Sequence, residues 1–414
     1  MSESVLLPIS FEEKDKKLKE SISDFENVKT DIKTGFEHYD IIKRQKRKIL
    51  NLLNASEKDW NDYRWHLNNA FSNALHLRTI LNLSEEHLRD IDTVGGRYRF
   101  LASPYYISII DINNPICPIR RQCLPSIEEL NDIGEYDPLN ENNTTINRMI
   151  SRRYPDRLIL NITNRCGTFC RHCQRKRLIG HSDKNVSKRY FVKAMEYIET
   201  NIEIRDVLIT GGDAFLVNDD QIEWILKELR RIRHVEIIRF GTRTPVTLPQ
   251  RITKSLVKIL KRHHPVYVNT QFNHPLEVTP ESQKACDMLA DAGIPLGNQM
   301  VLLNKVNNDK FIVRKLNHQL LKLRVKPYYI FHPYHVKGTS HFWITIQEGI
   351  DIMDSLRGFT SGMAVPYYVL NGPDGLGKTP VLPEYLLYMN EDMAIFRNWE
   401  GKLFETKNKK DIGI

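Results

Sequence analysis

Three cysteines stand close together in residues 164–175, directly after the apolar run 157–163. Cys166, Cys170 and Cys173 follow one another at spacings of four and three residues. Three thiolates on one short loop can hold three irons of a [4Fe–4S] cluster and leave the fourth iron open to a ligand that is not protein. The alternative is a structural zinc site that adds His172. Structural zinc usually takes CxxC pairs from two places, and the sequence holds no second pair, so the cluster is preferred.

A glycine turn follows the next apolar run. Gly211, Gly212 and Asp213 come directly after residues 206–210. Two successive glycines expose backbone and allow the close approach of a ligand. A tight turn explains an isolated Gly-Gly-Asp equally well, and it is the position one run after the cysteines that suggests a ligand.

A glycine-rich loop near the C-terminus ends in Lys378. Residues 372–379 match the phosphate-loop pattern GxxxxGKT, but Pro380 follows, so no helix can open there as that motif requires. A lysine presented by flexible glycines suits a Schiff base with pyridoxal phosphate. The alternative is a surface loop with an idle lysine.

Short apolar runs alternate with amphipathic stretches from residue 157 onward. This order predicts six parallel strands joined by helices, because each crossover must be right-handed. We therefore expect an α/β fold, a partial (β/α)6 barrel of the TIM type, with polar residues gathered at the carboxyl ends of its strands. The expected strands are 157–163, 206–210, 236–241, 266–272, 295–302 and 326–332, and the expected helices include 221–232, 249–262 and 280–292.

The remaining chain divides into three parts by its pattern. Residues 1–95 are expected to form an N-terminal helical subdomain, in which Trp65, Leu67, Phe71 and Leu75 form a buried stripe at helical spacing. Residues 96–150 are rich in turns and are expected to form a covering segment or a link between the helical part and the barrel. The barrel is expected over 151–345, and a C-terminal extension with the lysine loop over 346–414.

Composition is consistent with a protein of the reducing cytoplasm. Six cysteines in 414 residues are too few for a disulfide framework, and Cys117, Cys123 and Cys286 have no ligand spacing. No apolar run reaches membrane-spanning length, and the first residues lack the order of a signal peptide. We expect a cytoplasmic protein without membrane contact.

The net charge of +9 raises the question of nucleic acid. Part of the excess lies in the basic run 43–48, for which a solvated helix face is preferred because no aromatic platform accompanies it. Another part surrounds the cysteine loop, where small anionic ligands explain the charge better. Nucleic acid is therefore not expected as a partner.

The ordered motifs together resemble the lysine 2,3-aminomutase family of radical S-adenosylmethionine enzymes. The resemblance extends from about residue 60 to about residue 400. It is carried by RYPDR at 153–157, the cysteine loop to 177, TGGD at 210–213, TRTPV at 242–246, FNHP at 272–275, GNQ at 297–299, LRGFTSG at 356–362 and GKTP at 377–380.

The resemblance implies three cofactors, namely a [4Fe–4S] cluster, S-adenosylmethionine and pyridoxal 5′-phosphate. By position, the three cysteines would hold the cluster and Lys378 would carry the pyridoxal. Arg153 and Arg157 match the arginines that grip its phosphate, and Gln299 falls where the family places a partner for the pyridine nitrogen. Other implied cofactor contacts are His172, Gly211, Gly212 and Asp213.

The implied activity is an isomerisation. A 5′-deoxyadenosyl radical removes hydrogen from the β-carbon of the substrate, the α-amino group moves to that carbon, and hydrogen then returns. Arg175 matches the residue that binds the substrate α-carboxylate, a task for which a guanidinium fork is suited. The implied partners are a small amino acid, an electron donor of the flavodoxin or ferredoxin type and further copies of the chain.

The substrate depends on two positions that hold aspartate in the lysine-specific branch. Here they are Tyr334 and Asn371, a neutral pair that cannot compensate a buried ammonium. The chain therefore resembles most the glutamate 2,3-aminomutase branch, although Tyr334 replaces a lysine of that branch. Lys337 is a candidate for the distal carboxylate or a plain surface lysine, and Gln271 replaces a histidine that relatives place near the adenosyl cofactor.

Two other functions stay open on the residues alone. One is lysine or arginine 2,3-aminomutase activity. The other is a radical enzyme that modifies a protein lysyl residue or RNA, for which the basic run 43–48 is the support and against which the lysine loop argues.

Overall fold

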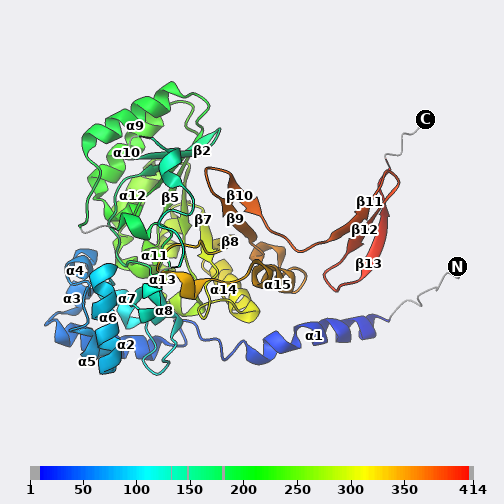
Figure 1. Ribbon diagram of the computed structural model, residues 1–414, viewed down its shortest axis with the longest axis horizontal. Coiled ribbons are helices and arrows are strands. Elements are labelled where there is room, and N and C mark those ends of the chain that lie inside the picture. Colours follow the sequence, from blue (N-terminus) through cyan, green and yellow to red (C-terminus); the bar gives the residue numbers. More distant parts are fainter. Residues whose placement is uncertain (1–9, 132, 147–148, 180–181, 410–414) are drawn as a thin grey trace.

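The computed structural model describes residues 10–131, 133–146, 149–179 and 182–409, and a curled sheet of ten strands lies at its centre (Figure 1). Six neighbouring strands are parallel and follow chain order, which confirms the predicted partial barrel. They are β3 (Arg157–Asn161), β4 (Asp206–Thr210), β5 (Ile237–Gly241), β6 (Val266–Thr270), β7 (Leu296–Val301) and β8 (Val325–Phe331).

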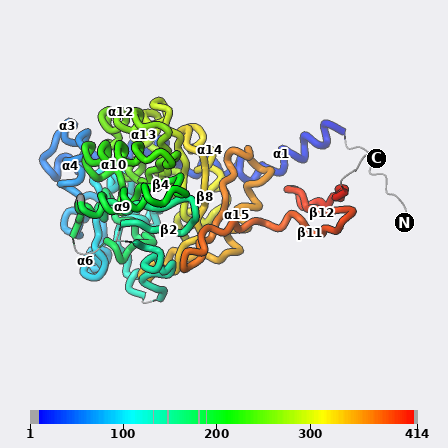
Figure 2. The backbone as a smooth tube through the Cα atoms, turned by 90° about the horizontal axis from the view of Figure 1, so that it is seen from above, coloured from blue at the N-terminus to red at the C-terminus, as the bar shows by residue number. Residues whose placement is uncertain are grey.

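Helices cover the outer face of the sheet, as Figure 2 shows from above. Each is amphipathic, and α10, for example, buries Ile222, Ile225, Leu226 and Leu229. The helices between the parallel strands are α9 (Lys188–Thr200), α10 (Asp219–Arg231), α11 (Thr244–Thr247), α12 (Lys254–Arg262), α13 (Pro280–Asp291) and α14 (Lys310–Lys322), with short turns η3 (Lys176–Leu178), η4 (Ala214–Leu216), η5 (Pro249–Arg251) and η6 (Pro275–Glu277).

The strands alternate between two environments. In β3, Leu158 and Leu160 are buried toward the helices, whereas Arg157, Ile159 and Asn161 lie on the inner face and line a cavity. Successive side chains of a strand point to opposite faces, so one pattern of alternation builds both the core and the cavity wall. Strands β4 and β5 repeat this pattern.

The sheet continues beyond the six predicted strands. On one side β2 (Ile150–Tyr154) pairs antiparallel with β3, and β1 (Thr145–Ile146) with β2. On the other side, after η7 (Ser340–Phe342), α15 (Ile346–Leu356) and η8 (Gly362–Ala364), β9 (Tyr367–Gly372) pairs parallel with β8 and β10 (Gly377–Pro380) pairs antiparallel with β9. The lysine loop is thus a hairpin of the barrel sheet itself, in which Lys378 lies opposite Asn371.

The N-terminal part is helical, with a capping box at Ser56, but the predicted buried stripe is wrong in part. The helix that carries Trp65 ends at Asn68, Phe71 instead pairs with the backbone of Ala102, and Leu75 is 75% exposed. The helices are α1 (Phe11–Val28), α2 (Tyr39–Leu52), α3 (Glu57–Trp60), α4 (Tyr63–Asn68), α5 (Leu77–Leu81) and α6 (Glu85–Arg97).

The segment of residues 98–131 and 133–146 contacts the cysteine loop. The backbone N–H of Phe169 donates to Leu101 O at 2.8 Å, and that of Arg171 donates to Gln122 O at 2.9 Å. This covering segment therefore fixes the loop on the side away from the barrel. Its elements are α7 (Pro104–Ser108), α8 (Pro118–Cys123), η1 (Ile127–Leu130) and η2 (Glu141–Thr144), followed by β1.

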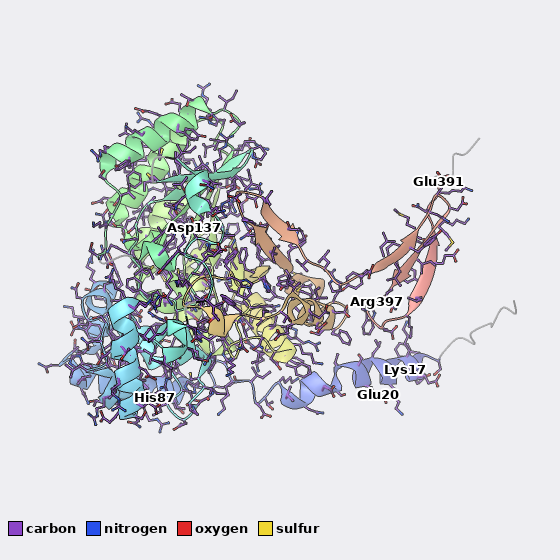
Figure 3. The ribbon with its side chains drawn as sticks, in the orientation of Figure 1. Lys17, Glu20, His87, Asp137, Glu391 and Arg397 are labelled. Carbon is purple, nitrogen blue, oxygen red and sulfur yellow. The ribbon has the colours of Figure 1, made fainter. Side chains whose placement is uncertain are left out.

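A second sheet projects away from the barrel at the C-terminal end (Figures 1 and 3). It consists of the antiparallel strands β11 (Leu386–Met389), β12 (Met393–Arg397) and β13 (Leu403–Lys407). The Arg397 guanidinium, at the inner end of this sheet, pairs with Asp354 of α15 at 3.2 Å. Among the described helices, none combines the length and the apolar character that a membrane span needs.

Candidate active site

A cavity of about 850 Å³ opens at the carboxyl ends of the parallel strands. This volume is near the upper end of the range for ligand pockets, ~300–1,000 Å³. The predicted residues that line it are Arg153, Arg157, Cys166, Cys170, His172, Cys173, Arg175, Gly211, Gly212, Asp213, Gln299, Tyr334, Asn371 and Lys378. The fold therefore brings together all of the predicted site residues except Lys337.

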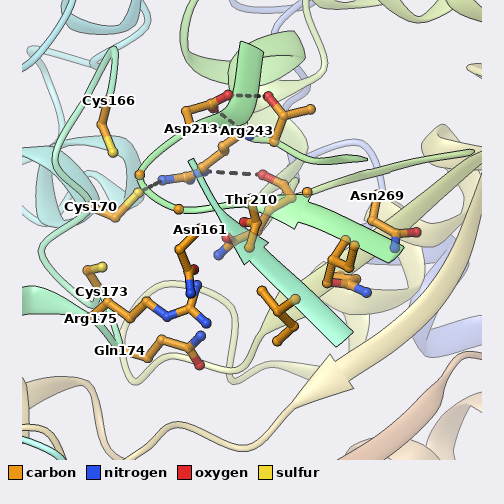
Figure 4. Close-up of a pocket in the computed structure, with 18 of the residues that line it drawn as sticks. Asn161, Cys166, Cys170, Cys173, Gln174, Arg175, Thr210, Asp213, Arg243 and Asn269 are labelled. Carbon is orange, nitrogen blue, oxygen red and sulfur yellow. Dashed lines mark hydrogen bonds between the residues drawn. The ribbon is translucent and has the colours of Figure 1, made fainter. Parts of the chain in front are cut away.

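The three cysteines lie on the loop between β3 and η3, along one wall of the cavity (Figure 4). Burial raises the pKa of the Cys166 thiol and brings the pKa of Cys173 to about 11. Arg243 donates from Nη1 to Cys170 Sγ at 2.8 Å. A donor set of three thiols beside one guanidinium is suited to a cluster whose ligands are thiolates. Among the described residues, no three His, Cys, Asp or Glu side chains converge as ligands of one metal ion would.

Basic residues of the cysteine loop are held by a carboxylate of the covering segment. Glu129 is fully buried, and its Oε2 accepts from Arg171 Nη2 and from Lys176 Nζ, both at 2.6 Å. Lys176 Nζ also donates to Gly338 O at 2.8 Å. The loop is thus tied to the covering segment and to the loop after β8. Sequence reasoning missed Glu129, because its partners are 42 and 47 residues away.

The glycine turn has a structural cause that differs from the one expected. A side chain at Gly211 or Gly212 would collide with the backbone of Thr163, Asn164 or Arg165, which lead into the cysteine loop. The N–H groups of Gly212 and Asp213 donate to carbonyls of that same backbone. Both glycines line the cavity, but they are required first for the packing of two loop backbones.

Asp213 lines the cavity, and its carboxylate is also engaged by groups of the protein. Its carboxylate accepts from Thr242 Oγ1 at 2.5 Å, from the Arg243 N–H at 2.8 Å and from the Phe215 N–H at 3.1 Å. Burial raises the pKa of this carboxyl, and these donors oppose the rise. Asp213 therefore joins the end of β4 to the end of β5 (Figure 4) and positions the turn.

Lys378 projects over the inner face of the sheet. Its Nζ lies 5.6–5.9 Å from the ring centroids of Tyr154, Tyr329 and Phe331. Removal from bulk water, followed by the charge of Arg239, lowers the pKa of the Lys378 ammonium to about 8. Much of the side chain still faces the open cavity, so solvent there screens part of the effect. A lowered pKa favours the neutral amine that attacks a carbonyl.

The hairpin that presents Lys378 depends on Gly377. This glycine has φ +78°, and a Cβ there would meet the Tyr154 ring at 2.9 Å. The adjacent Lys378 N–H donates to Tyr154 Oη at 2.8 Å. The predicted role of the glycines in presenting the lysine therefore has a local basis.

Arginines and one carboxylate form the wall near Lys378. Arg153 and Arg157 line the same cavity as Lys378, and their charges add to the lowering of its pKa. Glu141, a residue that sequence reasoning missed, accepts from Arg153 Nη2 at 2.8 Å and from Arg175 Nη2 at 3.0 Å. Burial raises the pKa of a carboxyl, but the guanidiniums outweigh it and hold the Glu141 pKa at about 2.

His172 and Gln271 contact each other at the cavity. The Nε2 atoms of the two side chains are 3.2 Å apart, and His172 Nε2 is 3.4 Å from Asn273 Nδ2. Burial lowers the pKa of His172, so its ring is neutral near pH 7. Gln271 thus lies directly beside His172 on the cavity wall. Gln299, on β7, lines the cavity opposite.

Tyr334 and Asn371 meet across the mouth of the barrel. Asn371 donates from Nδ2 to Tyr334 Oη, so the two neutral side chains satisfy each other. Lys337 is not a lining residue, which is against the prediction that it reaches the substrate. Its Nζ lies 5.0 Å from the Tyr136 ring centroid, and its backbone N–H is bonded to Glu135 O. Tyr334 before it and Thr339 after it line the cavity, whereas Lys337 does not.

Several buried polar atoms of the lining have no hydrogen-bond partner among the residues that the structure describes. They are Arg153 Nε, Asn161 Oδ1, His172 Nδ1, Asn269 Nδ2 and Thr270 Oγ1. Buried polar groups normally have partners, so such atoms are suited to polar ligands. The set combines donors and acceptors and therefore fits a polar cofactor or substrate.

The basic run 43–48 does not line this cavity. It lies on α2, where Lys43 pairs with Asp40 and Lys46 pairs with Glu57. Gln45 of the same run is buried. The structure is consistent with the preferred interpretation, a solvated helix face.

The comparisons with known proteins agree with the geometry. The Radical SAM superfamily model matches residues 160–313, which include the cysteine loop and most of the barrel. A family model described as Lysine-2,3-aminomutase matches residues 353–411. The chain is therefore a radical S-adenosylmethionine enzyme.

Individual relatives define the family more narrowly. The chain is 49% identical to glutamate 2,3-aminomutase of Clostridioides difficile, over 96% of this chain and 94% of that one. It is 46% identical to L-lysine 2,3-aminomutase of Fusobacterium nucleatum, over 84% and 82%, and 45% identical to that of Clostridium subterminale, over 84% of each. This protein belongs to the lysine 2,3-aminomutase family.

Membership confirms the predicted class of activity and cofactors. The protein is an isomerase, an amino acid 2,3-aminomutase. Its cofactors are a [4Fe–4S] cluster, S-adenosylmethionine and pyridoxal phosphate.

Proposed function

We propose that the protein moves the α-amino group of L-glutamate, or of a related amino acid without a distal ammonium, to the β-carbon. The observation that carries the proposal is the neutral Tyr334–Asn371 pair at the cavity wall. The similarity to a glutamate 2,3-aminomutase over nearly the whole of both chains supports it.

The charges of the cavity support an acidic substrate. Of the described side chains that line it, seven are Lys or Arg and three are acidic. Each acidic group is already engaged: Glu141 by arginines, Asp206 by Arg239 at 2.8 Å, and Asp213 by Thr242 at 2.5 Å. Among these described residues, no carboxylate is left to compensate a buried distal ammonium, and unpaired buried charges are costly.

The chain contributes binding and positioning. Cys166, Cys170 and Cys173 would hold the cluster. Lys378 would carry pyridoxal phosphate, whose phosphate would lie at Arg153 and Arg157. When bound, the cofactors supply the radical that removes hydrogen and the conjugated system that stabilises the migrating nitrogen. The remaining assignments are Arg175 for the α-carboxylate, Gln299 for the pyridine nitrogen, and His172, Gly211, Gly212 and Asp213 around S-adenosylmethionine.

Lysine 2,3-aminomutase activity is the second candidate, because the lysine enzymes are 45–46% identical to this chain. The test is to incubate the reduced, reconstituted enzyme anaerobically with each common amino acid and to separate α- and β-isomers by chromatography. β-Glutamate as the main product supports the proposal. β-Lysine formed at the higher kcat/KM would refute it and leave only the family.

We also propose that the protein is a homo-oligomer. Two strands of the projecting sheet, β11 and β13, are exposed along their whole length and carry apolar side chains. A small sheet is stable when one apolar face is covered. A second copy could cover it, and light scattering after size exclusion would test this. The exposed residues include Leu386, Leu387, Tyr388, Met389, Leu403 and Phe404.

Two further proposals concern the surroundings of the enzyme. A cluster that must be reduced requires an electron donor, for which a flavodoxin or ferredoxin type is proposed. A cytoplasmic location is proposed because three free thiols at the cavity must stay reduced to bind iron.

A further inference from the structure

Glu141 is the most heavily paired carboxylate of the cavity. Its side chain is 6% exposed and contacts three guanidiniums that are themselves 10–14% exposed. The Arg153 contact is 2.8 Å, the Arg175 contact 3.0 Å and the Arg177 contact 3.3 Å. Arg177 is also held by Asp137 at 3.0 Å. One buried carboxylate thus connects arginines from β2 and from the cysteine loop.

The contacts of Glu141 leave the arginines with defined free edges. Arg175 uses Nε and Nη2, one complete edge of its guanidinium, to bind the carboxylate. A guanidinium has a second edge that can bind another carboxylate with two hydrogen bonds. Arg153 uses Nη2, and its Nε is buried with no partner in the described part of the chain. Each arginine therefore keeps donors that are available to a ligand.

Hydrogen bonds fix the conformation of the turn that carries Glu141. Asp137 accepts from the N–H groups of Glu141 and Asn142 at 3.1 and 3.3 Å, and Thr145 donates from Oγ1 to Glu141 O at 2.6 Å. Asn140, with φ +47°, precedes it in the left-handed conformation that asparagine tolerates. The position of the carboxylate is therefore fixed before any ligand arrives.

We propose that Glu141 is a positioning residue that orients Arg175 for the substrate α-carboxylate and offsets part of the positive charge that Arg153 presents to the cofactor phosphate. The inference rests on the proposed function for the roles of these arginines. Glu141 does not touch the reacting atoms. It holds one edge of Arg175, so that the other edge faces the substrate in a single orientation, and its negative charge limits how strongly the site attracts anions in general.

The substitution Glu141→Gln should weaken binding of the amino acid without weakening binding of pyridoxal phosphate. A glutamine amide has one accepting oxygen where the carboxylate has two, so Arg175 loses its fixed orientation, and we expect KM for the amino acid to rise about tenfold, which corresponds to about 1.4 kcal/mol. Loss of the negative charge removes repulsion of other anions, so Kd for pyridoxal phosphate, measured by absorbance without S-adenosylmethionine, should stay the same or fall. Glu141→Asp keeps the charge and should recover part of the KM.

Glu203→Gln is the matched control. Glu203 pairs with Arg152, the neighbour of Arg153 in β2, at 2.6 Å, but its side chain is 49% exposed and neither residue lines the cavity. The same chemical change there should leave both KM and the pyridoxal Kd at wild-type values. Thermal melting of all three variants reports whether the fold is retained.

The outcomes separate the inference from the proposed function. A higher KM with an unchanged or tighter pyridoxal Kd supports the inference. An unchanged KM, or equal weakening of amino acid and pyridoxal binding with a lower melting temperature, would overturn it. If wild type converts no amino acid, the proposed function fails. The inference is then tested by the Kd for inorganic phosphate. A higher phosphate Kd in Glu141→Gln than in wild type would contradict it.

Discussion

The reactivity of Lys378 on β10 should depend on Arg239, an arginine of β5 that lines the same cavity. Burial is the largest cause of the low pKa of Lys378, and Arg239 is the largest of the charges that add to it. Replacement by glutamine in Arg239→Gln should raise the pKa. The change also frees Asp206, now paired with Arg239 at 2.8 Å, whose negative charge further stabilises the lysine ammonium. Both effects therefore act in the same direction.

The magnitude follows from the fraction of neutral amine. A lysine with its ordinary pKa of 10.5 is almost wholly protonated at pH 7, whereas at a pKa of about 8 the neutral fraction is larger by a factor of ~300, a difference of 2.5 pKa units. Because Lys378 faces the open cavity, solvent weakens the influence of one charge. We expect Arg239→Gln to raise the pKa by about one unit, which makes imine formation ~10-fold slower at pH 7.

The assay is the rate at which apo-protein forms an imine with pyridoxal, followed by absorbance between pH 6 and 10. Pyridoxal without its phosphate avoids a change in phosphate affinity. Arg205→Gln is the control, because Arg205 pairs with Glu236 at an exposed position outside the cavity. A wild-type midpoint near 10.5, or the same midpoint in wild type and Arg239→Gln, would refute the reasoning.

Three further predictions concern the cofactors and the substrate. Cys170→Ala should lower the iron content and abolish turnover while the chain stays folded, whereas Cys286→Ala, a buried cysteine of α13, should keep its iron; normal iron in Cys170→Ala contradicts the cluster assignment. Borohydride reduction of the loaded enzyme should attach pyridoxal to the peptide with Lys378, and labelling of another lysine would show that this assignment is mistaken. Tyr334→Asp combined with Asn371→Asp should increase the ratio of kcat/KM for lysine to kcat/KM for glutamate at least ~10-fold in competition. Two carboxylates can compensate the charge of the lysine ammonium, which the neutral pair cannot do. An unchanged ratio argues against the distal-pocket assignment.

Much of the scaffold was predictable because its signals are local. Each parallel strand is a short apolar run followed by an amphipathic helix, and the run 206–210 reappears in the structure as β4 with the same bounds. The cysteine loop and the lysine loop were recognisable because their residues are adjacent in sequence. The barrel then brings them together, since carboxyl ends of parallel strands share one edge.

The residues that sequence reasoning missed act over long separations. Glu141 lies in a turn-rich stretch without periodicity, and its partner Arg175 is 34 residues away. The one local signal was Asp137, which caps the turn before Glu141. Of the two alternatives for Lys337, the surface lysine fits the structure better, because Tyr334 lines the cavity and Lys337, three residues later, does not.

The covering segment compensates part of the positive charge of the cysteine loop, a role that its irregular sequence does not indicate. Arg171, Lys176 and two further arginines carry four positive charges within seven residues of the cysteine loop, and such a loop would repel itself when buried. Two carboxylates, Glu129 and Glu141, each bind part of that charge, and both come from the covering segment. The positive charge that remains is suited to thiolate ligands and anionic substrates. The pairing of Glu129 and Glu141 with the basic residues of the loop therefore explains why this segment of short helices and turns packs so closely against the site.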